Sequence, residues 1–224
     1  MLKGLLKKLL EKNGKSYTPD NNLTDKFIFS VLSSRTLMLI RGYFVLRKKI
    51  FLGKKVKIKN KRNFSFGSSC TIEKYVTLDC YAKEKVTFGH TVKIGAYSTV
   101  SVTGHMSKYG QGLSIGSNCG IGEYSFLGCA GGIVIGNDVI MGPYVSFHSE
   151  NHNFSNKDKL IREQGVTSQG IILGNNIWIG AKSTFLDGCE IGDNCVVAAG
   201  AVVKDKFPSG VVIGGVPAKI LKKI

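Results

Sequence analysis

Two of the four histidines are candidates for acid–base catalysis. His148 and His152 lie close together in the polar segment Phe147-His148-Ser149-Glu150-Asn151-His152-Asn153-Phe154, whereas His90 and His105 have no such setting. A neutral imidazole titrates near working pH, so it can take a proton from an attacking group. Two histidines alone could also be ordinary polar loop residues. Their meaning therefore depends on the elements that position them.

Those elements appear as a repeat in which an apolar residue recurs every six positions. The triplets are Phe66/Ile72/Leu78, Phe88/Ile94/Val100, Ile115/Ile121/Leu127, Ile135/Met141/Phe147, Leu173/Ile179/Phe185 and Ile191/Val197/Val203. Each triplet predicts three short strands that form one triangular coil, with the apolar side chain pointing inward. Gly and Asn between the strands, as in Gly136-Asn137-Asp138, suit corners with positive φ. The pattern predicts a parallel β-helix of about six coils over residues 63–210, closed by a tail at 211–224.

The cysteines fit the same register. Cys70, Cys119, Cys189 and Cys195 each lie four positions after a repeat residue, at a small inward position. A free cysteine there acts as a small apolar residue, and six sparse cysteines without a CxxC pair indicate a reduced compartment. A thiol nucleophile is the weaker alternative.

One interruption stands out in this regular pattern. The fourth and fifth triplets are separated by about 20 extra residues, which predicts a protruding polar loop at 148–170. A smaller excursion covers residues 103–113. Function tends to sit where polar loops leave a rigid scaffold, so the loop brings His148 and His152 back into consideration.

The positive charge belongs to the N-terminal segment. Residues 1–62 hold 17 Lys/Arg against three acids, a net charge of +14, and the rest of the chain is nearly neutral. No nucleic-acid-binding module or aromatic–basic groove accompanies this charge, so we do not expect nucleic acid as a partner. The segment 1–62 is therefore interpreted as a basic, partly helical appendage.

Two interpretations of this appendage remain open. In residues 2–10, five leucines share one face of a predicted helix: Leu2, Leu5, Leu6, Leu9 and Leu10. Residues 26–50 repeat this amphipathic pattern. Such helices can lie on an anionic membrane, or they can pack on the open end of the β-helix. Arg35 and Arg41 interrupt the apolar run at 27–46, and no cleavable signal peptide is expected. We expect a cytoplasmic protein with peripheral membrane contact through residues 1–50 as one possibility.

Four stretches resemble the maltose, galactoside and xenobiotic acetyltransferase branch of the hexapeptide-repeat transferases, and more specifically the surface-polysaccharide O-acetyltransferases. The stretches are Ile135-Gly136-Asn137-Asp138-Val139-Ile140-Met141-Gly142, Glu150-Asn151-His152-Asn153-Phe154, Asn176-Ile177-Trp178-Ile179-Gly180-Ala181 and Gly214-Gly215-Val216-Pro217-Ala218-Lys219. Their order, with the insertion between coils four and five, carries the resemblance. It implies an all-β, left-handed parallel β-helix and a homotrimer with active sites between subunits.

The resemblance also implies catalytic roles. His152 falls on the family's general base, and Glu150 or a backbone carbonyl would orient its ring. The N–H of Ala181 falls on the family's oxyanion donor. Trp178, the only Trp, would shield the thioester, or it would be an outward packing residue at a subunit contact. His148 and Asn151 are candidate acceptor-binding residues.

Acetyl-CoA is the co-substrate that the resemblance implies, with no metal required. Its backbone contacts would fall on Ala199 and Gly200, and its phosphates on Lys204 and Lys206. Many relatives read Thr-Lys-Asp where this chain has Lys204-Asp205-Lys206, so the lysine is shifted. Some sugar transferases carry an Asn in the coil before the loop, and this chain has Leu127-Gly128-Cys129-Ala130-Gly131-Gly132 there.

These observations predict an acetyl-CoA-dependent O-acetyltransferase acting on a sugar hydroxyl in a surface polysaccharide or lipid-linked glycan precursor. The alternative within the fold is an N-acetyltransferase acting on an amino-sugar nucleotide or another small amine. A γ-class carbonic anhydrase shares the prism but needs three histidines on zinc. A scaffold without catalytic activity is the remaining alternative.

Overall fold

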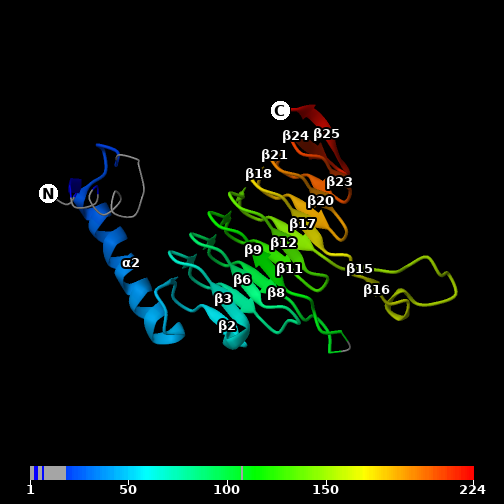
Figure 1. Cartoon of the computed structure of the whole chain (residues 1–224), viewed down its shortest axis with the longest axis horizontal. Coiled ribbons are helices and arrows are strands. Elements are labelled where there is room, and N and C mark those ends of the chain that lie inside the picture. Colours follow the sequence, from blue (N-terminus) through cyan, green and yellow to red (C-terminus); the bar gives the residue numbers. More distant parts are fainter. Residues whose placement is uncertain (1–2, 5–6, 8–18, 107) are drawn as a thin grey trace.

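The computed structural model describes residues 3–4, 7, 19–106 and 108–224 of the 224-residue chain. Most of this chain forms a parallel β-helix, in which short strands stack into three sheets around a triangular prism (Figure 1). The helix α2 (Asp25–Leu46) precedes the prism, and one long loop stands away from it.

Each of the three sheets runs along the prism. The first sheet contains β1 (Phe51–Leu52), β4 (Thr71–Ile72), β7 (Lys93–Ile94), β10 (Gly120–Ile121), β13 (Ile140–Met141), β18 (Ile177–Ile179), β21 (Cys195–Val197), β24 (Val211–Gly215) and β25 (Ala218–Lys223). The second sheet contains β2 (Lys57–Lys59), β5 (Thr77–Asp79), β8 (Thr99–Ser101), β11 (Phe126–Gly128), β14 (Ser146–His148), β19 (Thr184–Leu186) and β22 (Val202–Val203). The third sheet contains β3 (Phe64–Phe66), β6 (Val86–Phe88), β9 (Leu113–Ile115), β12 (Ile133–Ile135), β17 (Ile171–Leu173), β20 (Glu190–Ile191) and β23 (Lys206–Phe207).

Each coil takes one strand from the first, second and third sheets in turn, so the seven strands of the second and third sheets make seven complete coils. The sequence predicted about six. The additional coil begins at β1, so the β-helix starts at Phe51, inside the range 1–62 that was assigned to the appendage. Leu52 and Ile58 are spaced by six there, but the surrounding lysines at 54–62 hide the pattern because they occupy the outer face. The tail at 211–224 adds β24 to the first sheet and β25 antiparallel to β24.

The core is a column of inward side chains with one layer per coil, as the repeat predicted. Phe147 and Phe185 are fully buried and stack with ring centroids 4.5 Å apart. All six cysteines are free and buried, including the four whose register predicted an inward position. Loss of hydration on burial raises the pKa of the Cys80 and Cys189 thiols to about 12. These thiols are therefore apolar filling at neutral pH rather than nucleophiles.

The corners of the prism adopt the left-handed backbone that the turn residues predicted. Between the third and first sheets, positive φ falls on the polar residues Asn118, Asp138, Asn176 and Asn194. Between the first and second sheets, it falls instead on stacked tyrosines, which the repeat did not predict. They are Tyr75, Tyr97, Tyr124 and Tyr144, with successive ring centroids 4.9, 4.9 and 5.0 Å apart.

The predicted interruption is a loop at the corner between the second and third sheets. The chain leaves after His148 at the end of β14 and returns at Ile171 at the start of β17. Within the loop, β15 (Asn151–His152) pairs antiparallel with β16 (Val166–Thr167), and a 3-10 turn, η2, covers Ile161–Glu163. Another 3-10 turn, η1 (Lys61–Asn63), lies at the same corner of the first coil. Figure 1 shows the loop extending outward from the prism.

Helix α2 packs at β1, the edge strand of the first sheet. It begins where the Thr24 hydroxyl accepts a hydrogen bond from the Phe27 N–H (3.2 Å), and it ends at Arg47 in a left-handed conformation. Close packing requires Gly42, because a Cβ there would collide with the backbone oxygen of Ile50. The leucine face predicted for residues 2–10 lies outside the residues that the structure describes.

Candidate active site

His152 lies at the base of the loop, in the short strand β15. Its backbone pairs with Val166 of β16, which fixes where the side chain begins. The imidazole is exposed, and within the described chain it has no hydrogen bond or ion pair with another side chain. An imidazole held by its backbone and open to solvent can receive a proton from a bound acceptor.

Glu150 is held by other partners than His152. Its Oε2 accepts a hydrogen bond from the Ser168 hydroxyl (3.0 Å) and lies 3.5 Å from Lys108 Nζ. Lys108 also donates to the Ser168 hydroxyl at 2.5 Å. The carboxylate therefore ties the loop to the smaller excursion, and the structure does not bring it to the ring of His152. Sequence reasoning missed Lys108 and Ser168, because no local pattern indicates that the two excursions meet.

The two candidate acceptor-binding residues flank this base. His148 ends β14 on the outer face of the second sheet, where its ring lies 5.6 Å from that of Phe126. Asn151 is exposed beside His152, and its backbone oxygen accepts from the Thr167 hydroxyl at 3.5 Å. Both side chains are free to meet a ligand that lies against the second sheet.

Two buried polar residues that the sequence did not single out fix the root of the loop. The Ser149 hydroxyl donates to the Gly128 oxygen (2.7 Å) and accepts from the Gly131 N–H (2.9 Å). Asp187 Oδ1 accepts the N–H groups of Gln169 and Gly170, both at 2.8 Å. Asp187 is 8% exposed, and its Oδ2 has no hydrogen-bond partner in the described part of the chain. In sequence, an Asp before a Gly is indistinguishable from a common turn residue.

Ala181 and Trp178 lie on another part of the prism. Trp178 is 58% exposed on the outer face of the first sheet, beside Ile140 and Val196 in neighbouring strands. Ala181 turns the corner between the first and second sheets, and its N–H donates to no other described group. That free N–H is what an oxyanion would need.

The two predicted CoA-binding amides differ in availability. The Gly200 N–H donates to the Ala181 oxygen at 2.9 Å, so it is occupied within the chain. The Ala199 N–H has no backbone partner among the described residues. The structure therefore brings Ala181 next to the 199–200 turn and leaves Ala199 as the available donor.

The two predicted phosphate-binding lysines form ion pairs. Lys204 lies 3.7 Å from Asp205, and both side chains are more than half exposed. Lys206 Nζ lies 2.6 Å from Glu190 Oε1 on the outer face of the third sheet. Lys204 follows β22, so it lies at the corner between the second and third sheets, the same corner that carries the loop.

The candidate residues thus fall at two different corners of one prism. The loop residues and Lys204 lie between the second and third sheets, whereas Ala181 and Ala199 lie between the first and second. About five residues of extended chain separate the two corners, or about 16 Å at 3.3 Å per residue. A single chain does not bring the two groups together.

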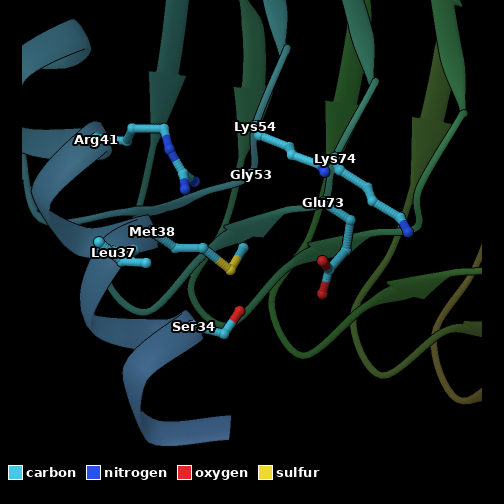
Figure 2. Close-up of a pocket in the computed structure, with 8 residues that line it drawn as sticks. All are labelled: Ser34, Leu37, Met38, Arg41, Gly53, Lys54, Glu73 and Lys74. Atoms are coloured by element: carbon cyan, nitrogen blue, oxygen red, sulfur yellow. The ribbon is translucent and has the colours of Figure 1, made fainter. Parts of the chain in front are cut away.

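A shallow pocket lies far along the chain from these residues, between α2 and the first coils. Its volume is about 280 Å³. Figure 2 shows the helix on one side of it and Gly53, Lys54, Glu73 and Lys74 on the other. Among the residues that the structure describes, no group of three His, Cys, Asp or Glu side chains is arranged to hold a metal.

Comparisons with known proteins agree with the repeat and the fold. The profile of the family described as "Bacterial transferase hexapeptide (six repeats)" matches residues 170–205. The chain is 28% identical to WbbJ of Escherichia coli, whose name places it as an O-acetyl transferase in lipopolysaccharide biosynthesis, over 70% of this chain and 81% of WbbJ. The chain therefore carries the hexapeptide repeat of these transferases. It is an acyltransferase, and the predicted fold class, a left-handed parallel β-helix, is confirmed.

Other known proteins also match. The galactoside O-acetyltransferase of Escherichia coli is 34% identical over 41% of this chain, and the match spans 44% of that enzyme. Among solved structures, a mutant of AntD, an N-acyltransferase from Bacillus cereus in complex with dTDP and coenzyme A, has a TM-score of 0.60. It is 23% identical and covers 71% of this chain and 82% of its own, which identifies the fold alone.

Proposed function

We propose that this hexapeptide transferase moves an acetyl group from acetyl-CoA to a hydroxyl of a sugar in a surface polysaccharide or a lipid-linked glycan precursor. The exposed imidazole of His152, at the base of the loop and without a side-chain partner in the described part of the chain, carries the proposal. The similarity to WbbJ over most of both chains favours a hydroxyl on a glycan as the acceptor.

The proposed reaction is a direct attack on the thioester. His152 accepts the proton of the acceptor hydroxyl as that oxygen bonds to the acetyl carbonyl carbon. The carbonyl oxygen becomes an oxyanion, which accepts a hydrogen bond from the Ala181 N–H. When the tetrahedral intermediate collapses, the carbon–sulfur bond breaks, and the CoA thiolate takes the proton from the imidazolium. No covalent enzyme intermediate forms.

We propose a homotrimer in which His152 of one copy meets Ala181 and Trp178 of another. The separation of the two corners supports this, because neither corner alone holds both a base and an oxyanion donor. The outer faces of the prism offer apolar contacts for such an assembly. They are Val134 and Ile172 on the third sheet and Ile140 and Trp178 on the first, each about half exposed.

We place acetyl-CoA along the corner that carries Ala181 and Ala199. The Ala199 N–H is the available backbone donor there, and Trp178 lies on the adjoining face. Lys204 and Lys206 approach the phosphates from the neighbouring copy, and Lys206 must then exchange its ion pair with Glu190 for a phosphate. Surface ion pairs contribute little to stability, so this exchange costs little.

The second candidate is N-acetylation of an amino sugar or another small amine. A specific similarity favours it: 53 residues are 47% identical to a 2,3,4,5-tetrahydropyridine-2,6-dicarboxylate N-acetyltransferase of Clostridium perfringens. That match covers only 24% of this chain. The similarity to WbbJ covers a larger share of this chain, so it favours a hydroxyl acceptor over an amine.

Acceptor profiling tests the proposal. Release of free CoA thiol from acetyl-CoA is followed with neutral sugars, lipid-linked glycans and amino-sugar nucleotides, and each product is analysed by mass spectrometry for an ester or an amide. We expect an ester with a glycan acceptor. An amide product with an amino sugar would replace this proposal by the second candidate, and absence of transfer to both classes would contradict both.

A further inference from the structure

Helix α2 presents two opposite faces, and only one of them packs on the protein. Arg35, Met38 and Gly42 recur at helical spacing and face the first coil. The Arg35 guanidinium donates to the Thr71 hydroxyl (3.0 Å), and Met38 and Gly42 are buried. One turn further along the same side, Arg41 donates to the Leu52 oxygen at 2.7 Å. The helix is therefore fixed in its rotation about its own axis.

The opposite face carries large exposed apolar side chains, with the polar Ser33 and Thr36 between Phe29 and Ile40. We call Phe29, Ile40, Tyr43 and Phe44 the outward stripe; their exposed fractions are 65%, 48%, 56% and 71%. They share one side of the helix because Ile40 follows Phe29 by eleven residues, and Tyr43 and Phe44 follow Ile40 by three and four, all close to whole helical turns. Large side chains gathered on an exposed face of this kind indicate an interaction surface.

The charge around this helix identifies its partner. Residues 25–62 hold twelve Lys/Arg and one acid, Asp25, whereas the prism beyond is nearly neutral. Lys26 and Arg47 stand at the two ends of the outward stripe, and Lys48 and Lys49 follow directly. An apolar stripe bordered by lysine and arginine complements an anionic lipid surface.

The pocket beside α2 adds a place for a headgroup. Arg41 lines it from the helix, and Lys54 and Lys74 line it from the first coils, as Figure 2 shows. Glu73 also lines the pocket, and it lies 3.8 Å from Lys93, which offsets its charge. The net character of the pocket is cationic, which suits a phosphate at the level of the lipid headgroups.

The helix cannot both cross a bilayer and keep its contacts with the prism. By length and composition α2 could span a membrane, and 17% of its most apolar window is buried. Crossing would pull Arg35 and Arg41 away from Thr71 and Leu52 and place two guanidinium groups in hydrocarbon. Lying along the surface keeps both contacts and still buries the outward stripe.

We propose that α2 is a membrane-docking helix that lies in the interface of an anionic bilayer, with the outward stripe inserted and Lys54 and Lys74 on lipid phosphates. This surface is separate from the acyl-transfer site, so the proposal stands independently of the acceptor. It would hold the prism where lipid-linked substrates are found.

The test is co-sedimentation of the full chain with vesicles of phosphatidylcholine, with or without about 30% phosphatidylglycerol. We expect binding only to the anionic vesicles, and loss of binding in high salt. The double variant Ile40→Asp/Phe44→Asp should weaken binding by at least about tenfold. The matched control Leu160→Asp/Ile161→Asp makes the same charge change at two loop residues of similar exposure (56% and 57%), and it should bind like the wild type.

A second pair of variants tests the cationic part. Lys54→Gln/Lys74→Gln should weaken binding by roughly 25-fold, because each lysine near an anionic surface is worth about fivefold in affinity. The control Lys83→Gln/Lys85→Gln removes two lysines further along the prism, and its vesicle binding should stay close to that of the wild type. Wild-type protein that ignores anionic vesicles at low salt would overturn the proposal. An equal loss of vesicle binding in the Ile40/Phe44 variant and its control would also overturn the proposal. If the Ile40/Phe44 variant instead lowers the assembly mass in light scattering, the stripe is a contact between copies.

Discussion

Among single residues, the proposed acyl transfer depends most on one imidazole and one backbone N–H. Among the residues that the structure describes, His152 has no competing side-chain partner and the Ala181 N–H has no acceptor. Sequence alone could nominate both through the resemblance to known transferases. It could not show that Glu150 is engaged by Lys108 and Ser168, because that contact joins two excursions that are far apart in the chain.

Replacing His152 should lower activity and leave the affinity for CoA unchanged. We expect His152→Ala to lower kcat by about 10²–10⁴, the usual worth of a general base. His148→Ala should lose much less, since that ring packs near Phe126 on the second sheet. Steady-state kinetics and CoA binding by calorimetry separate the two effects. Equal losses in both variants would remove His152 from its assigned role.

The oxyanion donor can be deleted without changing the fold. Pro143 occupies the same corner position one coil before Ala181, since Met141 pairs with Ile179. Ala181→Pro should therefore fold and lack only the N–H, lowering kcat by about 10²–10³. The control is Glu123→Pro at the same corner, one coil earlier still. Unchanged kcat in Ala181→Pro would place the oxyanion elsewhere.

At the scale of elements, the repeat predicted most of the prism because the apolar residue of each short strand must point inward. The register of the six triplets and the loop at 148–170 both follow from that one requirement. The first coil was missed because lysines surround its two inward residues, Leu52 and Ile58. The tyrosine stack was also missed, since tyrosine is not a residue that the turn rules associate with positive φ.

The loop depends on Asp187 for its anchoring. Asp187 Oδ1 accepts two backbone N–H groups where the loop returns to the prism, and the residue is buried. Asp187→Ala should leave both donors unpaired and lower the free energy of unfolding by about 1–3 kcal/mol for a buried donor. Urea denaturation measures this, and limited proteolysis should show faster cleavage between residues 149 and 170. A variant with wild-type stability and loop protection would show that the anchoring lies elsewhere.

At the scale of the whole molecule, the central claim is that the site needs two copies of the chain. The proposed base, His152, and the proposed oxyanion donor, Ala181, stand at different corners of one prism, separated by the width of the second sheet. From the sequence, a site shared between two copies could be predicted only through the family resemblance. Assigning each residue to a corner of the prism requires the register of the coils, which the structure provides. If the site is shared in this way, a chain that lacks the base and a chain that lacks the oxyanion donor can together form an intact site.

The most direct measurement is the activity of mixed assemblies of His152→Ala and Ala181→Pro chains, co-expressed with different tags and purified through both. A cyclic trimer that contains both variants has one junction at which an intact His152 meets an intact Ala181 N–H. We predict about one third of wild-type activity in such mixed trimers, far above either variant alone. Activity that stays at the level of the single variants in verified mixed trimers would contradict it.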